Sequence, residues 1–448
     1  MNFTGKKISV IGAVRSGIGA AKLIKKARAT PFVSDSGSEF KLADSISKLK
    51  ENNIDFEIEN HSEKVFDCDL MVVSPGVPSD AEVIKKAKSK NIKAISELEF
   101  ASLFCKGKIV AITGTNGKTT TTSLCGHVFN TCGFKTYTAG NIGVAFSEIA
   151  MDVKENEFVV LEVSSFQLDM IDKFKPDVAS ILNITPDHLN RYENKFENYV
   201  NSKLGIYKNQ TEEDYLILNN DSSTLINSIT EHKSKSVYFS LKEPQLNGSY
   251  LFENQIIYNE GGELKFICST DDINLKGEHN FANAMTVINA AKIFGFENEK
   301  IKKGLKTFKG VEHRLEFVRE IDGVIYINDS KATNVDSVWY ALRSFENQIF
   351  LILGGQDKGN DYNQIKDLVE NRVKKIYAIG SSSDNIFNFF HSIVKVEVKQ
   401  SMEDVIVSAN SEARDGDVVL LSPACASFDM FENYEHRGKV FKEIVNKL

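Results

Sequence analysis

The chain has 448 residues, of which 42% are hydrophobic and 26% are charged, with a formal net charge of −7. This length exceeds what one hydrophobic core organises and predicts about two to four domains. Basic and acidic residues are interleaved along the chain. No basic stripe is therefore available to neutralise phosphates, which argues against nucleic acid as the main partner.

The N-terminal segment, the apolar runs and the cysteines indicate the compartment. No apolar run approaches the roughly 20 residues of a bilayer span. The segment MNFTGKKISVIGAVRSG has no uninterrupted apolar core followed by a small-residue cleavage site, so it predicts a first strand and not a signal peptide. The six cysteines form no C-x-x-C pair and no metal-like spacing, which favours reduced thiols. We therefore expect a cytoplasmic protein with no membrane partner.

The first hundred residues alternate strand and helix signals. The strand KISVIG is followed by a glycine-rich turn over residues 12–19, an amphipathic helix, and strands that end at Asp35 and Ser74. This order predicts parallel strands with right-handed crossovers, a Rossmann-like unit. An acidic residue about 20 positions after the turn would suit the ribose of a dinucleotide. The turn is G-A-V-R-S-G and not G-x-G-x-x-G, so the dinucleotide hypothesis is weak.

Two further segments show the same alternation. From Lys108 the sequence predicts a strand, a tight turn and a helix, then strands in FVVLEVSS, VASILNIT and DYLILNND. Looser strand-like pieces occupy residues 222–272, and EHNFANAMTVINAAKIFGF predicts a helix. After Gly310, strands are expected in GVIYIND, IFLILGG, KKIYAIG and DVVLLSP. The pattern as a whole is typical of an α/β protein.

The turn GTNGKTT has the chemistry of a phosphate loop, although Ile112 stands where the usual loop has its first glycine. Gly114 and Gly117 can adopt the positive φ that directs successive N–H groups inward. The following helix adds its N-terminal partial charge. Lys118 can reach the β- and γ-phosphates, and Thr119 can ligate magnesium. The order strand, G-x-x-G-K-T-T, helix favours a nucleotide site over a turn whose lysine is only solvated.

Magnesium on the nucleotide requires oxygen ligands, and two strand ends offer candidates. Glu162 ends an apolar strand, where an unpaired carboxylate is costly to bury. If that strand is a parallel neighbour of the phosphate-loop strand, Glu162 lies near Thr119. Asp187 and His188 follow another apolar strand, at the edge where open α/β sheets bind ligands. A purely structural role is the alternative for Glu162 and for His188.

Together, the motifs identify a family. GTNGKTT, LEVSSFQL, NITPDHLNRY, GEHNFANAMTVINAA, EHRLE, NDSKATN, GGQDKGND and SPACASFDMFENYEHRG follow in this order over most of the chain. They closely resemble the Mur ligases of peptidoglycan synthesis. The phosphate-loop and H-N-x-x-N motifs are family-wide and are shared with folylpolyglutamate synthase. The last three motifs match the branch that adds D-glutamate, whereas the Asp-Asn-Pro-Arg signature of the diaminopimelate- or lysine-adding branch is absent.

The resemblance implies three domains and a reaction. The domains are a UDP-substrate-binding Rossmann-like domain (1–104), a central P-loop ATPase-like domain with a parallel or mixed sheet (105–309), and a C-terminal Rossmann-like domain that binds the amino acid (310–448). The implied reaction joins D-glutamate to UDP-N-acetylmuramoyl-L-alanine through an acyl phosphate, with release of ADP and phosphate, in cytoplasmic peptidoglycan precursor synthesis. A monomer is expected, as is hinge closure before the chemical step. The dinucleotide hypothesis is thereby replaced.

The resemblance also implies roles for individual residues. ATP is expected to bind Gly114, Thr115, Asn116, Gly117, Lys118, Thr119, Thr120, Asn280, Asn283, Arg314 and Asp329. Two magnesium ions are expected on Thr119, Glu162, His188 and Lys203. The UDP-linked substrate is expected on Ser16, Gly17, Asp35, Ser74, Pro75, Gly76 and Asn141. D-Glutamate is expected on Lys331, Thr333, Lys358, Ser427 and Tyr434. Catalysis is expected from Lys118, His188, Lys203, His313 and Arg314.

Lys203 matches the lysine that this family carries as a carbamate. A carbamate converts a cation into an oxygen donor for magnesium, but it forms only from the neutral amine. That form requires burial or nearby positive charge. Without the resemblance, Lys203 would be taken for a helix-surface lysine, and Asn280 and Asn283 for helix-packing amides.

The chain departs from its relatives at a few positions. Val14 stands where a second glycine is common, and Arg15 replaces a residue that is often small or acidic, so the UDP contacts are the least secure expectation. Asn190 is often Asp in the family, which removes any ionic role there, and Tyr434 is often Phe.

The sequence argues against three rival functions. A sibling amide ligase would add another amino acid, or glutamate to a folate. A nucleotide-dependent switch would bind ATP without forming amides and would not require the acid-binding motifs. A nucleic-acid motor would require a basic surface and helicase motifs, and neither is found in the sequence.

Overall fold

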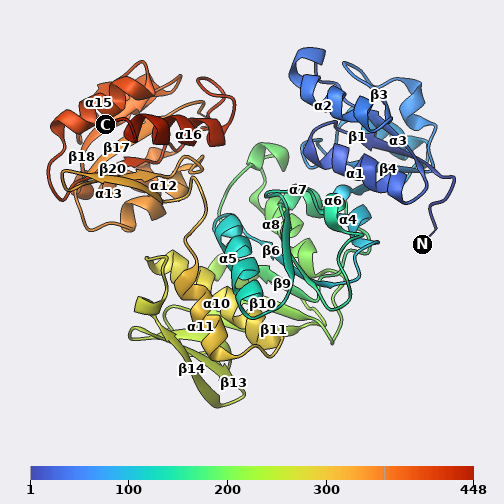
Figure 1. Ribbon diagram of the computed structural model, residues 1–448, viewed down its shortest axis with the longest axis horizontal. Coiled ribbons are helices and arrows are strands. Elements are labelled where there is room, and N and C mark those ends of the chain that lie inside the picture. Colours follow the sequence, from blue (N-terminus) through green and yellow to red (C-terminus); the bar gives the residue numbers. More distant parts are fainter. Residues whose placement is uncertain (1, 358) are drawn as a thin grey trace. The chain divides into compact units, whose positions relative to one another are not determined.

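The computed structural model describes residues 2–357 and 359–448, in two compact units. The first unit comprises Met1–Asn274 with Asn280–Phe308, and the second comprises Leu275–His279 with Lys309–Leu448 (Figure 1). Lys358, a predicted D-glutamate ligand, lies outside the described residues. Among the helices of the described ranges, none combines the length and apolarity that a membrane crossing requires.

The first unit begins with a five-stranded parallel sheet, drawn in blue in Figure 1. Its order is β3-β2-β1-β4-β5. The strands are β1 (Lys7–Ile11), β2 (Thr30–Ser34), β3 (Asp55–Glu57), β4 (Leu70–Val73) and β5 (Ala94–Ser96). The associated helices are α1 (Arg15–Lys26), α2 (Glu39–Glu51), η1 (Glu63–Phe66), α3 (Glu82–Ser89) and α4 (Glu97–Ser102). The predicted Rossmann-like arrangement is confirmed, because β1 pairs in parallel with both β2 and β4.

The same unit contains a nine-stranded mixed sheet of order β14-β13-β12-β11-β10-β9-β6-β8-β7. The strands are β6 (Lys108–Thr113), β7 (Thr136–Gly140), β8 (Phe158–Glu162), β9 (Val178–Ile181), β10 (Tyr215–Asn219), β11 (Lys235–Ser240), β12 (Asn247–Phe252), β13 (Gln255–Glu260) and β14 (Glu263–Ser269). The pairs β12–β13 and β13–β14 are antiparallel. The loosely patterned region of the sequence therefore forms the edge of the sheet.

Helices of the first unit connect and cover this mixed sheet. They are α5 (Lys118–Thr131), α6 (Phe146–Ile149), α7 (Ser165–Leu168), η2 (Leu189–Arg191), α8 (Phe196–Leu204), η3 (Gly205–Tyr207), α9 (Ser223–Ser228), η4 (Thr270–Asp272), α10 (Glu278–Ile293) and α11 (Asn298–Thr307). The central strands β6, β8 and β9 are buried almost throughout. Strands that are covered on both faces are continuous apolar runs without alternation, and β6, β8 and β9 have this pattern.

The second unit has a six-stranded sheet of order β15-β16-β20-β17-β18-β19, drawn in orange to red in Figure 1. The strands are β15 (Glu316–Ile321), β16 (Val324–Asn328), β17 (Ile349–Gly354), β18 (Val373–Ile379), β19 (Lys395–Val398) and β20 (Val418–Leu421). The helices are α12 (Val335–Arg343), η5 (Tyr362–Ile365), α13 (Lys366–Arg372), α14 (Ser383–Phe390), α15 (Met402–Glu412) and α16 (Tyr434–Val445). Among the described residues of this sheet, only the pair β15–β16 is antiparallel.

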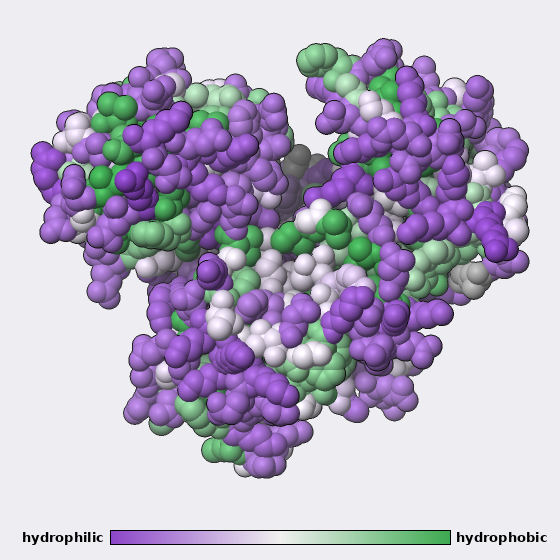
Figure 2. Space-filling view, in the orientation of Figure 1, coloured by the Kyte–Doolittle hydropathy of each residue, from purple (hydrophilic) through white to green (hydrophobic). Residues whose placement is uncertain are grey.

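Apolar side chains also reach the surface at the edge of the mixed sheet. Leu246, Phe252, Leu264 and Phe266 are all at least half exposed. Figure 2 shows green apolar groups where Figure 1 draws the β13–β14 hairpin. Single exposed apolar residues are common on soluble proteins, and this group carries no functional argument by itself.

Candidate nucleotide and amino-acid sites

The predicted strand, turn and helix of the phosphate loop are present between β6 and α5. Gly114 has φ 151° and Gly117 has φ 83°, both in the region that favours glycine. A Cβ on Gly117 would lie 2.7 Å from Oδ1 of Asn283. The ammonium of Lys118 donates to the carbonyl oxygens of Gly114 at 2.8 Å and of Thr115 at 2.7 Å. The lysine is thus folded back over its own loop.

Asn183, two residues after the end of β9, forms hydrogen bonds with the phosphate loop. Its Oδ1 accepts from the backbone N–H of Asn116 at 2.9 Å, and its Nδ2 donates to the carbonyl of Asn116 at 3.1 Å. Its own carbonyl accepts from the N–H of Thr115 at 3.0 Å. One side chain therefore pairs with both backbone polar groups of Asn116. Sequence analysis did not identify this residue.

Thr119 and Glu162 meet as the sequence predicted. Strands β6 and β8 pair in parallel, with Ile112 opposite Glu162. This register brings Oγ1 of Thr119 to 2.7 Å from Oε2 of Glu162, and the carboxylate is buried. Its other oxygen accepts from Nδ2 of Asn141 at 2.9 Å. A buried carboxylate beside the loop hydroxyl is an oxygen donor set of the kind that magnesium prefers.

Lys203 is a buried lysine at the same loop. Its Nζ donates to the carbonyl of Gly114 at 2.8 Å and lies 4.6 Å from the centre of the Tyr199 ring. Burial lowers the pKa of Lys203 well below the usual 10.5, and the positive charge of Lys118 lowers it further. The neutral amine is thereby favoured. The residue taken for a surface lysine from the sequence alone is one of the largest fully buried side chains of the chain.

Two polar side chains of the loop after β9, those of His188 and Arg191, have defined contacts. His188 has φ 51°, and its Nε2 lies 3.6 Å from Oδ2 of Asp187. Nearby, the guanidinium of Arg191 lies 4.3 Å from the centre of the Phe166 ring and donates to the carbonyl of Gly76 at 3.4 Å. Arg191 thus connects this loop to the Ser74–Gly76 turn, a link that the sequence did not predict.

The helix amides Asn280 and Asn283 lie close together on α10. Oδ1 of Asn283 accepts from Oγ1 of Thr121 at 3.0 Å, and its Nδ2 lies 3.3 Å from Oδ1 of Asn280. Both are buried. The contact with Thr121 is the helix-packing arrangement that the sequence left open as an alternative to adenine binding.

The glycine turn after β1 is held by Asp35. Its carboxylate accepts from the N–H of Ala13 at 2.6 Å and of Gly37 at 2.7 Å. A Cβ on Gly17 would lie 1.7 Å from the carbonyl oxygen of Gly12, so glycine is required there. Oγ of Ser74 donates to the same carbonyl at 3.3 Å. The predicted UDP-contact residues Gly17, Asp35 and Ser74 therefore surround the turn after β1.

Two further predicted contacts of the UDP-linked substrate, Ser16 and Pro75, are the chain neighbours of Gly17 and Ser74. Val14 and Arg15 are exposed, and Ser16 and Pro75 are half-buried. The departures from the family at Val14 and Arg15 are thus at the surface of the turn.

In the second unit, Asp329 is a buried carboxyl after β16. It accepts from the N–H of Leu315 at 3.2 Å and from Oγ of Ser422 at 2.8 Å. Burial raises the pKa of Asp329 to about 6, while the positive charge of Arg314 opposes that rise. Arg437, which sequence analysis did not single out, is fully buried and donates from Nε to Oγ of Ser330 at 2.9 Å.

The predicted D-glutamate residues fall into two groups within the second unit. Nζ of Lys331 lies 5.3 Å from the centre of the Tyr434 ring, and the N–H of Thr333 donates to the carbonyl of Lys331 at 3.0 Å. The segment at Gln356 pairs with the one that carries Ser427, because the N–H of Gln356 donates to the carbonyl of Ala426 at 2.8 Å.

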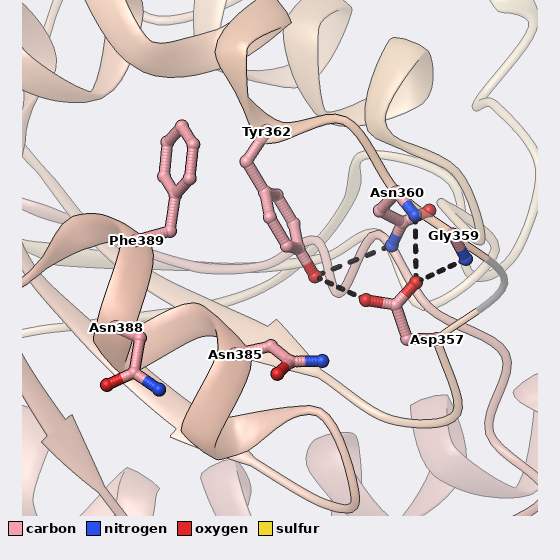
Figure 3. A pocket seen from close by; sticks show the side chains of 7 residues that line it. All are labelled: Asp357, Gly359, Asn360, Tyr362, Asn385, Asn388 and Phe389. Atoms are coloured by element: carbon pink, nitrogen blue, oxygen red, sulfur yellow. Dashed lines mark hydrogen bonds between the residues drawn. The ribbon is translucent and has the colours of Figure 1, made fainter.

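A cavity of about 630 Å³ adjoins the Gln356 segment (Figure 3). It is lined by Asp357, Gly359, Asn360, Tyr362, Asn385, Asn388 and Phe389. Oδ1 of Asp357 accepts from the N–H groups of Gly359 at 2.7 Å and Asn360 at 2.9 Å. Nδ2 of Asn360 donates to the carbonyl of Ala424 at 3.2 Å. The two segments are thus joined by side chains as well as by backbone.

Comparison with known proteins places these sites in a family. Residues 7–83 match the family model for the MurD N-terminal domain, residues 112–291 the Mur ligase middle domain, and residues 313–425 the Mur ligase, glutamate ligase domain. The UDP-N-acetylmuramoylalanine--D-glutamate ligase of Chloroherpeton thalassium is 43% identical over 99% of this chain and 98% of its own length. The ligases of the same name from Christiangramia forsetii and Clostridioides difficile are 44% and 41% identical, over 99% and 100% of this chain and 100% of their own lengths.

Solved structures show the same fold at lower identity. UDP-N-acetylmuramate-alanine ligase MurC from Thermotoga maritima has a TM-score of 0.64 at 18% identity, with 99% of each chain covered. MurF ligase from Thermotoga maritima, in complex with ADP, has a TM-score of 0.61 at 16% identity, with 93% of this chain and 95% of that one covered.

The three sheets, the phosphate loop and these matches define a three-segment α/β ligase, and the chain belongs to the Mur ligase family. Within the family it falls in the branch that the MurD N-terminal domain represents. The predictions of the family and of the α/β fold class are confirmed.

Proposed function

We propose that this enzyme uses ATP to join D-glutamate to UDP-N-acetylmuramoyl-L-alanine, forming an amide with ADP and phosphate as the other products. The observation that carries the proposal is the buried set of Lys203, Thr119 and Glu162 at the phosphate loop. Relatives above 40% identity over nearly their whole length carry the corresponding enzyme name. The rival of a simple nucleotide switch gives no reason to bury a lysine beside the loop.

The phosphate loop residues are proposed to hold the triphosphate. The loop peptides offer N–H groups at the start of α5, where the helix adds positive partial charge. Lys118 would exchange its two loop carbonyls for phosphate oxygens. Asn280, Asn283, Arg314 and Asp329 remain proposals for the adenosine and phosphate ends.

The donor set fits magnesium. Thr119 and Glu162 offer a hydroxyl and a buried carboxylate 2.7 Å apart, and the His188 imidazole is proposed as a further ligand. Bound magnesium would neutralise phosphate charge and orient the triphosphate. A second ion and the carbamate on Lys203 belong to the same proposal, supported by the burial of Lys203 and by the direction of its pKa shift.

A carboxylate is a poor electrophile because its leaving group would be oxide, so the reaction must first activate it. A carboxylate oxygen of the alanine end attacks the γ-phosphorus, so that an acyl phosphate forms and ADP leaves. The neutral amine of D-glutamate then attacks the acyl carbon, the amine loses a proton, and inorganic phosphate departs with its P–O–C oxygen. Two anions must be held together, so positioning and charge neutralisation provide most of the catalysis.

The second unit is proposed to bind D-glutamate. Lys331, Thr333, Lys358, Ser427 and Tyr434 are the proposed contacts. Lysines and hydroxyls are suited to the two carboxylates of this amino acid because charged donors make the stronger hydrogen bonds. The functional segments are proposed at residues 1–104, 105–309 and 310–448.

The test is phosphate release from ATP with magnesium and UDP-N-acetylmuramoyl-L-alanine, with D-glutamate, L-glutamate, L-alanine or meso-diaminopimelate as acceptor. Release only with D-glutamate is expected. Glu162→Gln should abolish it, and Glu155→Gln, an exposed change in the turn before β8, should not. Release with another amino acid would contradict the substrate assignment, and no release with any of the four would contradict the ligase proposal.

A further inference from the structure

Asn328, the last residue of β16, is fully buried against the imidazole of His313. Its Nδ2 lies 2.9 Å from Nδ1 of His313, 3.0 Å from Oε2 of Glu316 and 3.3 Å from the carbonyl oxygen of Gly438. Its Oδ1 accepts from the N–H of Ser330 at 3.2 Å. The amide therefore has four contacts.

These contacts fix which way the amide points. Glu316 and Gly438 present oxygens, which accept hydrogen bonds, and Ser330 presents an N–H, which donates one. The reversed amide would place its oxygen against two oxygens and its NH₂ against an N–H. The NH₂ group of Asn328 is thus the one that faces His313.

An NH₂ group has two hydrogens and only donates, and its two shortest contacts are Nδ1 of His313 and Oε2 of Glu316. Nδ1 of His313 therefore accepts and does not carry a proton. A proton on Nδ1, whether in the other tautomer or in the imidazolium ion, would place two donors 2.9 Å apart. The neutral imidazole therefore carries its proton on Nε2. Burial acts in the same direction, because it lowers the pKa of His313.

The charged neighbours do not overturn this arrangement. Oε2 of Glu316 lies 3.8 Å from Nδ1, but it already accepts from the backbone N–H of His313 at 2.8 Å. Oε1 of Glu312 lies 3.9 Å from Nε2 on a largely exposed side chain. The ammonium of Lys442 donates to both carboxylates, and Glu435 contributes a weaker field.

Glycine at position 438 leaves room for the imidazole, and Lys442 argues against a metal ion beside it. A Cβ on Gly438 would lie 2.3 Å from Nδ1 of His313, so only glycine at this position of α16 admits the ring. Glu312, His313 and Glu316 also have the spacing of a metal cluster, but Lys442 already bonds to both carboxylates, and an ammonium there opposes a cation.

We propose that Asn328 is a positioning residue that keeps His313 neutral and protonated on Nε2, so that His313 donates a hydrogen bond to an oxyanion and does not act as a base. The inference rests on the proposed function for the identity of the acceptor of this hydrogen bond, which is a phosphoryl oxygen or the oxyanion of the tetrahedral intermediate. It assigns the deprotonation of the D-glutamate amine to another group or to water.

The test is nuclear magnetic resonance of the full-length protein labelled with ¹⁵N-histidine, in which long-range ¹H–¹⁵N correlations show the ring nitrogen that carries the proton. Loss of a signal in His313→Gln assigns the residue. Asn328→Asp replaces the donor with a carboxylate acceptor and should move the proton to Nδ1 or form the imidazolium. Asn347→Asp, an exposed change in the same unit, should leave the signal unchanged.

The kinetic expectation is a fall in kcat of about 100-fold in Asn328→Asp, comparable to the loss of one oxyanion donor, with the KM for ATP changed less than about twofold. A wild-type spectrum with the proton on Nδ1, or an imidazolium at neutral pH, overturns the inference even if the variant does not fold. An altered spectrum with unchanged kcat overturns the positioning role. Failure of the proposed function would instead appear as wild-type enzyme without D-glutamate-dependent phosphate release.

Discussion

Asn183→Ala should weaken nucleotide binding by loosening the phosphate loop. The change removes the bond from the Asn116 N–H at 2.9 Å and the bond to the Asn116 carbonyl at 3.1 Å. A typical intramolecular hydrogen bond contributes about 1 kcal/mol net, so the ordered loop loses about 2 kcal/mol. At about 1.4 kcal/mol for each factor of ten, the Kd for ATP rises by up to about thirtyfold.

The Kd for magnesium-ATP, measured by isothermal titration calorimetry, tests this value. Asn209→Ala is the matched control, because Asn209 also donates two side-chain bonds to backbone carbonyls, those of Asp172 and Phe174, in the same unit. The control should lower stability without changing the Kd for ATP. An unchanged Kd in Asn183→Ala, or equal changes in both variants, would refute the reasoning that the amide preorganises the loop.

Three further changes have defined outcomes. With ¹³C-labelled bicarbonate, the wild-type enzyme should show a carbamate resonance in its ¹³C spectrum that Lys203→Ala lacks and the exposed change Lys208→Ala keeps; a resonance surviving in Lys203→Ala would rule out the assigned site. The pKa of Asp329 is raised from 3.8 to about 6, so the native state binds its proton more tightly, and the stability that this group contributes is full below about pH 4 and declines as pH rises through about 6. Urea unfolding of Asp329→Asn should show a smaller decline over that range, and an equal decline would refute the linkage. Gly438→Ala places a Cβ 2.3 Å from Nδ1 of His313 and should lower the free energy of unfolding by about 1–3 kcal/mol; an unchanged denaturation midpoint would show that the ring can move aside.

The strands were predictable where apolar runs are continuous. β6 and β8 are such runs, and placing them side by side in parallel was sufficient to predict that Glu162 meets Thr119. Strands β12, β13 and β14, at one end of the sheet, were harder to predict, because they alternate weakly and expose apolar groups. Their antiparallel pairing depends on tight turns whose register the sequence pattern does not fix.

The burial of Lys203 had a signal that sequence analysis did not use. Helix α8 buries Tyr199, Val200, Lys203 and Leu204, so the lysine lies on the apolar stripe, four residues after Tyr199. A lysine on such a stripe is an exception that requires an explanation. Because lysine is charged, Lys203 was taken for a surface residue. The resemblance to the family singled out Lys203, which the apolar periodicity of α8 could also have done.

Asn183 and Asn328 had no comparable signal. Each acts through contacts between segments distant in sequence, from Asn183 to Asn116 and from Asn328 to His313 and Gly438. An asparagine after a strand is common as a turn residue, so its type does not reveal which backbone or ring it holds. Such positioning residues become visible only when the loops are placed.

The central claim is tested most directly by transfer of labelled oxygen. UDP-N-acetylmuramoyl-L-alanine carrying ¹⁸O in its alanine carboxylate is turned over with ATP, magnesium and D-glutamate, and the amide and the phosphate are analysed by mass spectrometry. The account predicts one ¹⁸O atom in the inorganic phosphate for each D-glutamyl amide formed, because the attacking carboxylate oxygen leaves with the phosphate. Amide formation with unlabelled phosphate, or phosphate release without the amide, would contradict the account.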